Sequence, residues 1–457
     1  MVAVRPNAVR VVIVGAGPAG IRAAQTLVAA GVKPVVIDEG ARAGGQIYRR
    51  PPPAFKRRAE ALYGSEASKA VDLHAVFDGM VASGTIDYLP ATSVLSHAEN
   101  VLHALTPAGR REIGYDRLII ATGATDRVAP VPGWQAPGVY SLGAAQIALK
   151  AQGVALGRSI VLAGSGPLLT FVAYQLLEAG AGVVAVLDTS GLRNQLAGLF
   201  GMLSRPRLVL RGLAMRARLG KLYHAGVTIT GIDTDSTGPV AIRWCDAGGK
   251  ARETACDMVA LGWHLRAETQ LAALAGCRFD YDADWLQWLP RADRMGRAGG
   301  NLYLAGDGLR ILGADGAEIA GRLAACACLS DMDLPAPDSA GDLRRLARCE
   351  RFARAMARAF PWPAQMVRQL PDETVVCRCE GVTAAGLREG AALGGTEVNR
   401  VKSLARVGMG RCQGRFCQLA AAEIIAADAA IDPAEAGRLR DQAPVRPLPI
   451  GAWIRDA

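Results

Sequence analysis

Short apolar runs alternate with amphipathic stretches and glycine-rich turns along the first two thirds of the chain. Residues 11–14 form an apolar run, an amphipathic stretch continues to Ala30, and a second apolar run ends at Asp38. The same order returns between Ser159 and Asp188. Apolar runs of this length, separated by helical periodicity, are typical of parallel strands joined by crossover helices. The pattern therefore predicts an α/β fold that contains a repeated βαβ unit.

The turn after the first apolar run has the glycine spacing of a dinucleotide-binding unit. It reads VVIVGAGPAG and ends where an amphipathic helix is expected to begin. Glycines at these positions allow a tight turn, bring backbone amides close to a pyrophosphate and let the helix pack against the strand. The helix N-terminus then stabilises the phosphate charge. The predicted binding residues of this turn are Gly15, Gly17, Pro18, Ala19 and Gly20.

A carboxylate closes the same unit. Asp38 follows Gly15 by 23 residues, at the end of the second expected strand. An acidic side chain at this place binds the ribose hydroxyl groups in such units. Glu39 is the alternative ribose ligand. The first unit therefore has both parts of a nucleotide site.

The second unit keeps two of the three glycines. Gly164 and Gly166 have the offsets of Gly15 and Gly17, but Leu169 stands at the third position, where its side chain would push helix and strand apart. Asp188 ends the second strand, and a carboxylate there favours NAD over NADP. Two interpretations stay open: a pocket for NAD(P) or an adenine nucleotide, and a structural remnant of a duplication.

Two later strands end in small-residue turns. LIIATG covers residues 118–123 and NLYLAGDG covers residues 301–308. With the first unit, these segments resemble the two-dinucleotide-domain flavoproteins of the glutathione-reductase and thioredoxin-reductase group. The resemblance implies FAD, with an ATG turn that joins the two domains and an aspartate that bonds the ribityl-phosphate region. The residues that it assigns to the cofactor are Ala121, Thr122, Gly123, Gly306 and Asp307.

Four cysteines near the C-terminal end have the spacing of metal-cluster ligands. Cys377 and Cys379 form a C-x-C pair, and after 32 residues Cys412 and Cys417 form a C-x4-C pair. The second pair flanks a glycine-rich turn whose amides can approach bound sulfide. The spacing resembles the [2Fe-2S] domain of the bacterioferritin-associated ferredoxin type. A zinc ion, which also accepts four thiolates, and an empty site are the alternatives.

Other titratable residues give weaker signals. Arg378, Arg411 and Arg415 can stabilise a reduced cluster, or they are solvated or meet carboxylates of a partner. His264 is interpreted as a surface or packing residue, and no catalytic base is named. Cys326 and Cys328 lie in a helix-like run, which favours buried packing over redox chemistry.

Composition excludes several classes of protein. The chain has 457 residues and a net charge of +10, but its basic residues are scattered, so we expect no nucleic-acid binding. Ten cysteines are too few for a disulfide scaffold, and ligand thiolates favour the reducing cytoplasm. Glycines and a proline interrupt the apolar stretch 159–187, so we expect no transmembrane segment and no signal peptide. Peripheral contact with the inner membrane is left open.

Three longer segments narrow the resemblance. DEGARAGGQIYRRP, GSGPLL and VKSLARVGMGRCQGRFC are similar to the flavoprotein subunit of heteromeric bacterial amine dehydrogenases. That group includes opine oxidases, hydroxyproline and proline dehydrogenases, and hydrogen cyanide synthases. The resemblance adds Gly45 and Gln46 to the cofactor residues. It implies a substrate-oxidising partner of the D-amino-acid-oxidase type and, in some members, a small ferredoxin-like subunit, while this chain relays electrons.

The expected domains follow from these motifs. A discontinuous FAD-binding domain is followed by a nucleotide-binding-like domain, a linker, a small [2Fe-2S] domain and a tail that docks on the body or on a partner. Their predicted ranges are 8–125 with 293–332, then 126–292, 333–370, 371–430 and 431–457. Besides the electron-relaying subunit, two functions remain open: a self-sufficient NAD(P)H-dependent reductase of a ferredoxin or small acceptor, and a non-catalytic partner-binding or iron-sensing module.

Overall fold

Two parallel sheets organise the computed structural model, which describes residues 9–451. The larger sheet has six strands, and only the pair at one edge is antiparallel. In spatial order its strands are β20 (Arg297–Gly299), β21 (Leu302–Leu304), β7 (Arg117–Ile120), β1 (Val11–Val14), β2 (Val35–Ile37) and β3 (Asp87–Leu89). Residues 11–120 and residues 297–304 therefore contribute to one sheet.

Helices cover one face of this sheet and antiparallel strands cover the other. The covering elements are α1 (Pro18–Ala29), α3 (Ala67–Ala82) and α10 (Gly313–Ser330) on the first face, and β4 (Ser93–Ala98), β5 (Val101–Thr106) and β6 (Gly109–Gly114) on the second. Val11 and Ile13 pack with the helices, whereas Val12 and Val14 pack with the antiparallel strands. Because both faces are buried, β1 is apolar at every position and shows no polar alternation.

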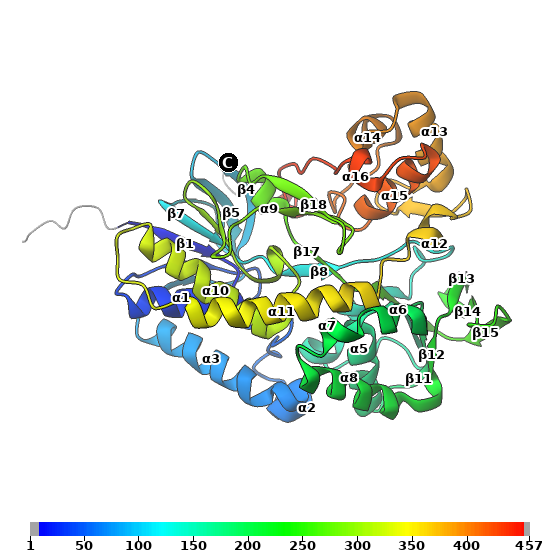
Figure 1. Cartoon of the computed structure of the whole chain (residues 1–457), viewed down its shortest axis with the longest axis horizontal. Coiled ribbons are helices and arrows are strands. Elements are labelled where there is room, and N and C mark those ends of the chain that lie inside the picture. Colours follow the sequence, from blue (N-terminus) through cyan, green and yellow to red (C-terminus); the bar gives the residue numbers. More distant parts are fainter. Residues whose placement is uncertain (1–8, 452–457) are drawn as a thin grey trace, which may run out of the picture.

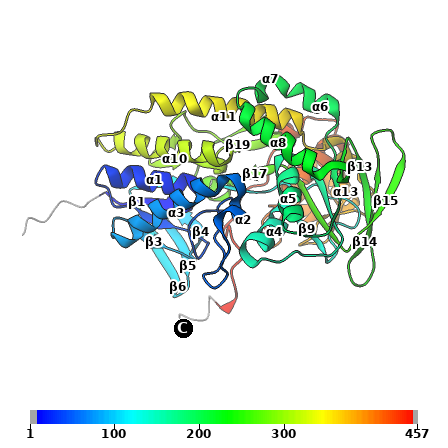
Figure 2. The same ribbon diagram turned by 90° about the horizontal axis from the view of Figure 1, so that it is seen from below.

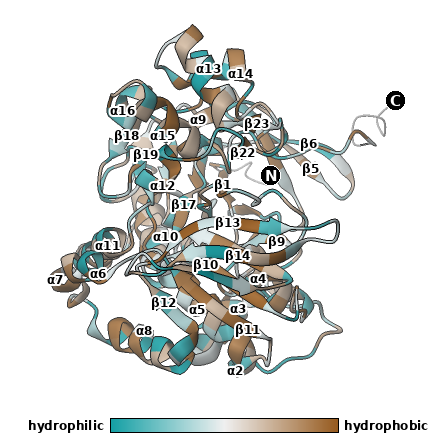
Figure 3. Ribbon diagram, turned by 90° about the vertical axis from the view of Figure 1, so that its right-hand side faces the viewer, coloured by the Kyte–Doolittle hydropathy of each residue, from teal (hydrophilic) through white to brown (hydrophobic). Residues whose placement is uncertain are grey.

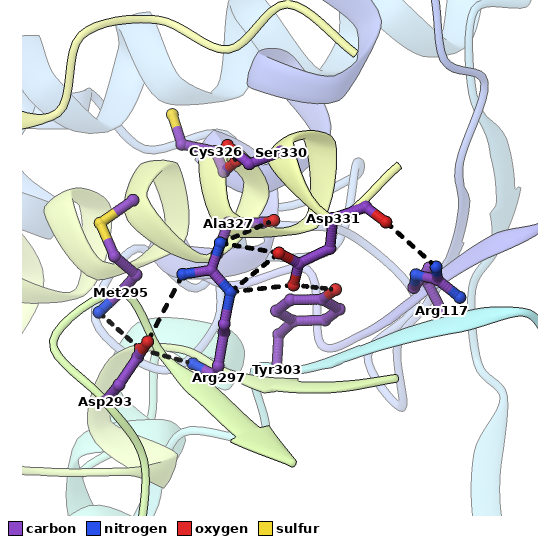
Figure 4. Close-up of polar contacts among 9 residues, drawn as sticks. All are labelled: Arg117, Asp293, Met295, Arg297, Tyr303, Cys326, Ala327, Ser330 and Asp331. Carbon is purple, nitrogen blue, oxygen red and sulfur yellow. Dashed lines mark hydrogen bonds and ion pairs between the residues drawn. The ribbon is translucent and has the colours of Figure 1, made fainter. Parts of the chain in front are cut away.

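A network of ion pairs fastens α10 to the edge of the sheet (Figure 4). Arg297 of β20 pairs with Asp331, which follows α10, with 2.9 Å between Nε and Oδ2. The hydroxyl group of Tyr303 in β21 donates a hydrogen bond of 2.8 Å to the same carboxylate. Arg117 of β7 donates to the backbone oxygen of Asp331. Residues from three strands thus hold the end of α10 in place.

The second sheet has five parallel strands and repeats the layered arrangement. Its strands, in spatial order, are β12 (Tyr223–Ala225), β11 (Val183–Asp188), β10 (Ile160–Ser165), β16 (Met258–Trp263) and β9 (Val139–Ser141). Helices α4 (Leu142–Ile147), α5 (Pro167–Glu178) and α8 (Pro206–Leu219) pack on one face of this sheet. Strands β13 (Thr228–Thr234), β14 (Pro239–Cys245) and β15 (Ala251–Ala255) form a separate antiparallel sheet. The predicted α/β architecture with two dinucleotide-type units is confirmed.

Two strands join the domains, and the chain then returns to the first sheet. The joining pair is β8 (Ala124–Asp126) with β17 (Leu265–Ala267), and the returning elements are α9 (Gln270–Leu274), β18 (Phe279–Asp282) and β19 (Gln287–Pro290). Leu271 and Ala272 of α9 are buried in the core beneath the first sheet. Residues 270–282 thus lie against the first domain, although the sequence pattern groups them with the second.

The expected linker contains a long helix. Helix α11 (Ala340–Ala359) runs along the molecule from α10 to α6 (Leu192–Ala197) and α7 (Leu199–Met202) of the second domain (Figures 1 and 2). Its alanines face these neighbours, so that Gly198 and Gly201 lie directly against Ala355. Helix α11 therefore packs closely against elements of both domains.

The C-terminal region packs on the second domain. It contains α12 (Ala364–Arg368), β22 (Val375–Cys377), β23 (Val382–Thr383), α13 (Ala384–Gly394), α14 (Val398–Ala405), α15 (Gln418–Asp428) and α16 (Pro433–Ala436). Cys377 and Cys417 share one continuous core with Trp134 and Trp263. The indole nitrogen of Trp134 donates to the backbone oxygen of Val375 at 2.5 Å. No helix among residues 9–451 is long and apolar enough to span a membrane.

Candidate functional site

Three separate sequence motifs meet at the end of β1. A Cβ atom on Gly15 would lie 2.2 Å from the backbone oxygen of Ala121, and one on Gly20 would lie 1.8 Å from the backbone oxygen of Gly15. Gly15 also has a φ of +108°, which a residue with a side chain rarely adopts. Both the first and the third glycine are therefore required by close contact, and Gly15 also by its conformation. The ATG turn lies directly beside Gly15.

The turn is also shaped to receive an anion. Helix α1 begins at Pro18 after Gly17, and among the described residues no side chain caps its N-terminus. The first turn contains no acidic residue. An uncapped helix start that follows a glycine turn binds phosphate through its backbone amides and its dipole. These residues fit the pyrophosphate of the FAD that the fold implies.

The loop after β2 returns to the same turn. A Cβ atom on Gly45 would lie 3.0 Å from the Cα atom of Gly17, so the two backbones touch. Gln46 is exposed beside it, and its Oε1 atom accepts a hydrogen bond of 2.8 Å from Arg49. The structure thus brings Gly45 to the phosphate turn, while the side chain of Gln46 faces solvent.

Asp38 supports the turn from the end of β2. Its Oδ2 atom accepts a hydrogen bond of 2.5 Å from the amide of Ala16, and its Oδ1 atom accepts one of 2.6 Å from Gly40. Burial raises the pKa of Asp38, although both amide hydrogen bonds oppose that shift. The neighbouring Glu39 instead forms an ion pair with Arg446. The carboxylate at position 38 therefore orders the nucleotide turn, and its role as a ribose ligand stays a prediction.

The GDG segment lies against the same turn. A Cβ atom on Gly306 would lie 2.8 Å from the Cβ atom of Ala19, and one on Gly308 would lie 2.9 Å from Oγ1 of Thr122. Asp307, between them, accepts hydrogen bonds at Oδ1 from the amides of Leu312 and Gly313, at 2.8 Å and 3.1 Å. Burial raises the pKa of Asp307 to about 6 despite these hydrogen bonds. All three predicted motifs of the flavin site thus converge.

The second dinucleotide unit has a different surrounding. Asp188 is completely buried, accepts a hydrogen bond of 2.8 Å from the amide of Ser190, and also accepts one from the hydroxyl group of Tyr223. Burial raises the pKa of Asp188, and these hydrogen bonds only partly offset it. Leu169 is completely buried in the core on the helical side of the sheet. The carboxylate that the sequence predicts for a ribose is therefore occupied by protein groups.

Side chains from other elements lie at the carboxyl ends of these strands, where a nucleotide would bind. Trp263, at the end of β16, is 1% exposed and donates from its indole nitrogen to Oγ1 of Thr189 at 3.0 Å. This contact crosses the end of β10, where Gly164 and Gly166 form the turn. The hydroxyl group of Ser190 donates to the last residue of α11, Ala359. These residues do not fit a bound nucleotide at this turn.

The four predicted cluster cysteines come together as two pairs. The thiol of Cys417 donates to the sulfur of Cys377, and this contact outweighs burial and lowers the pKa of Cys377 to about 6. The amides of Gly408, Glu380 and Cys379 also face the Cys377 sulfur. Burial and the proximity of Cys412 raise the pKa of Cys379. All ten cysteines lie within the described residues and are free, and among residues 9–451 no three His, Cys, Asp or Glu side chains are arranged to hold one metal ion.

A buried ion cluster connects the flavin side with the cysteine loop. Arg415 pairs with Glu268 at 2.8 Å, and Arg446 pairs with the same carboxylate at 3.2 Å. The backbone oxygen of Glu268 accepts a hydrogen bond of 2.7 Å from the hydroxyl group of Thr122, and Arg415 donates to the backbone oxygen of Cys412 at 3.3 Å. Burial would raise the pKa of Glu268, but the arginines outweigh it and lower that pKa.

The arginines predicted near the cluster have three different environments. Arg415 is 10% exposed and meets a carboxylate of its own chain, which corrects the alternative that it is solvated, while its role beside a cluster stays a prediction. Arg378 stacks over the rings of Trp134 and Phe416, at 5.4 Å and 4.7 Å from their centroids. Arg411 is exposed. The tail also docks on the body, because the amide of Val445 donates to Leu95 at 2.8 Å.

Two of the buried charged residues that sequence reasoning missed lie near the candidate sites. Glu268 lies between joining strand β17 and α9, and a single glutamate outside any motif gives no functional signal. Lys150 is 2% exposed, donates from Nζ to the backbone oxygen of Ile47 at 3.0 Å, and has a pKa lowered to about 8 by burial. It lies in a π-helical segment, Ala148–Gln152, a geometry that is frequent at functional sites. His264 is half-buried and its ring contacts that of Trp285; burial and the nearby Arg127 lower its pKa to about 4.

Comparisons with known proteins agree with this site. Residues 9–309 match the family described as pyridine nucleotide-disulphide oxidoreductase, and residues 372–456 match the sarcosine oxidase A3 domain. The A subunit of opine oxidase from Rhizobium meliloti is 37% identical over 96% of this chain and 86% of its own length. Hydrogen cyanide synthase subunit HcnB of Pseudomonas aeruginosa is 31% identical over 97% of this chain and 98% of its own length.

Solved structures show the same fold. L-proline dehydrogenase from P. horikoshii superposes with a TM-score of 0.71 at 18% identity, over 97% of this chain and 79% of that one. Thioredoxin reductase from T. acidophilum superposes with a TM-score of 0.52 at 18% identity, over 71% of this chain and 99% of that one. These likenesses extend beyond the two dinucleotide-type domains only in the first case.

Fold and site together define an oxidoreductase of the two-dinucleotide-domain class, whose fold implies FAD. The chain belongs to the pyridine nucleotide-disulphide oxidoreductase family and, within it, is a homologue of the A subunit of opine oxidase. The resemblance predicted from the sequence is confirmed at this level.

Proposed function

We propose that this chain is the FAD- and [2Fe-2S]-containing subunit of a heteromeric dehydrogenase or oxidase. Its substrate class is an opine, a D-amino acid or an imino acid such as hydroxyproline or proline. Support comes from HcnB and from the A subunit of opine oxidase, both of which are named as subunits and align with almost the whole chain. The substrate is oxidised on a partner flavin subunit of the D-amino-acid-oxidase type, and a small ferredoxin-like subunit completes some assemblies. The reduced thiols favour the cytoplasm as the site of action.

One observation carries the electron-relay part of the proposal. The four cysteines lie as two contacting pairs, Cys377 with Cys417 and Cys379 with Cys412. A two-iron cluster uses two protein ligands for each iron, so paired thiols fit it better than a single zinc ion that needs four ligands at once. The amides of Gly408, Glu380 and Cys379 stabilise the thiolate of Cys377 in the Cys377–Cys417 pair.

The two expected cofactors transfer different numbers of electrons at a time. Oxidation of an amine to an imine removes two electrons and two protons from the C–H and N–H bonds. When bound, FAD accepts two electrons together and the cluster passes them on one at a time. The protein residues position these groups: Gly15, Gly17 and Gly45 form the phosphate turn, and Glu268 with Arg415 fixes the cysteine loop relative to Thr122.

An anaerobic spectrum of the purified chain tests the proposal. Iron, sulfide and zinc are analysed, and NADH and then dithionite are added. FAD with equal iron and sulfide, bleached by dithionite and not by NADH, is the expected result. Bleaching by NADH would instead support the self-sufficient reductase, zinc without sulfide would remove the relay, and a chain that never retains FAD would support a non-catalytic module.

A cysteine variant identifies the ligands. Cys412→Ser is expected to remove the iron–sulfur absorption while FAD stays bound, because Cys412 lies in a loop apart from the nucleotide turn. Cys245→Ser is the control, since Cys245 is a free thiol outside both pairs. An unchanged iron content in Cys412→Ser would contradict the ligand assignment.

A further inference from the structure

Exposed apolar side chains gather on α6, α7 and α8. Seven of the 18 large hydrophobic side chains that are exposed among the described residues lie between positions 192 and 213. The others are scattered over the surface, which is ordinary for a folded protein. The seven are Leu192, Leu196, Leu199, Phe200, Leu203, Leu210 and Leu213. We call these residues the apolar ridge.

The side chains of the apolar ridge face away from the protein core, because the opposite faces of their helices are packed. In α8, Leu210, Leu213, Ala214 and Ala217 are all exposed at the spacing of one helix face, while α8 packs against α5 through its opposite face. Gly201 of α7 touches Ala355, so Leu199, Phe200 and Leu203 cannot turn toward α11. Figure 3 shows α7 and α8 along one edge of the molecule, with much of their ribbon coloured hydrophobic.

The segment that carries the apolar ridge has charged residues of one sign only. Residues 189–232 contain no aspartate or glutamate. Arg193 and Arg207 are exposed, and neither forms an ion pair with any residue that the structure describes. Ion pairs with Asp315, Glu66 and Glu178 engage three other arginines of the segment, which are Arg205, Arg211 and Arg218. Arg193 and Arg207 are thus exposed cations without a counter-charge among the described residues.

Helix α11 extends this positive field. Arg344, Arg348 and Arg351 follow one another at a spacing of four and three residues, are exposed, and form no ion pair within residues 9–451. Arg348 and Arg207 line one open cleft of about 890 Å³ between α11 and the start of α8, and Glu66, Asp72, Asp315 and Glu318 line it too. Three of these four carboxylates are already paired, with Arg211, Arg205 and Arg22. The hydroxyl group of Ser204, in the turn before α8, donates to the backbone oxygen of Arg348 at 3.4 Å. The arginine row and the apolar ridge therefore belong to one surface.

We propose that the apolar ridge and the adjoining arginine row form a docking surface for a bilayer of anionic phospholipid. Helices that lie in the plane of a membrane have leucine and phenylalanine on one face and arginine beside it. Anionic headgroups attract clustered arginine, and the attraction falls as salt screens it. Protein interfaces are also enriched in arginine and aromatic residues. The choice of a bilayer rests on the exposed leucine face with arginines beside it, in a segment, residues 189–232, that has no aspartate or glutamate. Phe200, 88% exposed at the tip of α7, is the residue placed to enter the lipid.

Vesicle flotation with the FAD-loaded full chain tests this proposal without any enzymatic turnover. The expected result is flotation with vesicles that contain phosphatidylglycerol, little flotation with pure phosphatidylcholine, and release at high salt. Phe200→Asp is expected to lower the bound fraction about tenfold. Leu393→Asp is the matched control, because Leu393 is 82% exposed on α13, outside the ridge, and it is expected to bind like the unchanged chain.

A triple variant, in which Arg344, Arg348 and Arg351 are changed to Gln, separates the electrostatic contribution to vesicle binding from that of apolar insertion. It is expected to weaken binding at low salt and to reduce the salt dependence. FAD content and thermal unfolding show whether each variant is folded. Absence of flotation with phosphatidylglycerol vesicles at low salt would overturn the proposal. So would a Phe200→Asp variant that still binds vesicles but no longer associates with the partner subunit, because the ridge would then be a subunit interface.

Discussion

Glu268 and Arg415 stand 147 positions apart in the sequence, and Nε of Arg415 donates a hydrogen bond of 2.8 Å to Oε2 of Glu268. The side chains are only 4% and 10% exposed. Through Thr122 on one side and Cys412 on the other, this pair links the turn after β7 to the cysteine loop. The pair thus provides a buried polar connection between the two candidate cofactor sites.

Glu268→Gln is expected to destabilise the chain by about 3 kcal/mol, because it leaves a buried arginine without its counter-charge. The loss should be local at first, so the cysteine loop unfolds or loses its metal before the flavin domain does. Thermal unfolding followed separately by flavin fluorescence and by visible absorption measures both events. Glu39→Gln is the control, since Glu39 is 47% exposed and is expected to cost less than about 1 kcal/mol. Equal effects of both changes would contradict the buried-cluster argument.

Asp307 is expected to govern retention of FAD. Its carboxylate orders the turn through the amides of Leu312 and Gly313, and Asp307→Ala removes both hydrogen bonds. We expect about a tenfold weaker affinity for FAD, equal to the loss of about one charge-assisted hydrogen bond. Ultrafiltration of the holoprotein against buffer measures the released flavin. Asp428→Ala, an exposed change on α15, should release no more FAD than the unchanged chain.

The sequence indicated the glycine turns and the ATG and GDG segments, because each is a local pattern with a local physical cause. It also indicated which four cysteines come together, but not that the contacts join Cys377 to Cys417 and Cys379 to Cys412, across the two motifs. Gly15, for example, needs a positive φ whatever surrounds it. Glu268 could not be predicted, since its function depends on Arg415 and Arg446, which only tertiary packing brings to it. The same holds for Lys150, a single lysine in a helix that is buried by a loop 103 positions earlier.

Acidification is expected to destabilise the loop beside the flavin turn through His74. Its Nε2 atom lies 2.9 Å from the backbone oxygen of Tyr48, and burial, with Arg50 nearby, lowers its pKa to about 4. In the unfolded chain a histidine has a pKa of about 6.5. Between these values the unfolded chain binds the proton and the folded chain does not, so stability falls as the pH drops from about 6.5 toward 4.

A variant isolates the contribution of His74 from that of other groups. His74→Gln keeps a donor for the Tyr48 oxygen but cannot titrate. The unfolding temperatures of both proteins are compared at neutral pH and at a pH near ~5. We expect the unchanged chain to lose more stability on acidification than His74→Gln. Identical losses would show that another group causes the pH dependence.

The second dinucleotide unit is expected to bind no nucleotide. Its carboxylate, Asp188, is fully buried and already bonded to Ser190, and Trp263 crosses the turn to reach Thr189. Calorimetric titration of the FAD-loaded chain with NADH, ADP and ATP should therefore give no heat of binding at this site. Micromolar binding of any of the three would contradict the closed crevice.

A tryptophan variant shows whether Trp263 alone blocks nucleotide binding or whether the hydrogen bonds of Asp188 also prevent it. Trp263→Ala removes the side chain that spans the turn, so Gly164 and Gly166 become accessible, but Asp188 keeps its partners. If closure by Trp263 alone excludes nucleotide, the variant should gain weak binding of ADP; if Asp188 is also committed to the protein, it should gain none. We expect the second outcome, because freeing Asp188 would break buried hydrogen bonds, at a cost of about 1 to 3 kcal/mol for each group left unpaired.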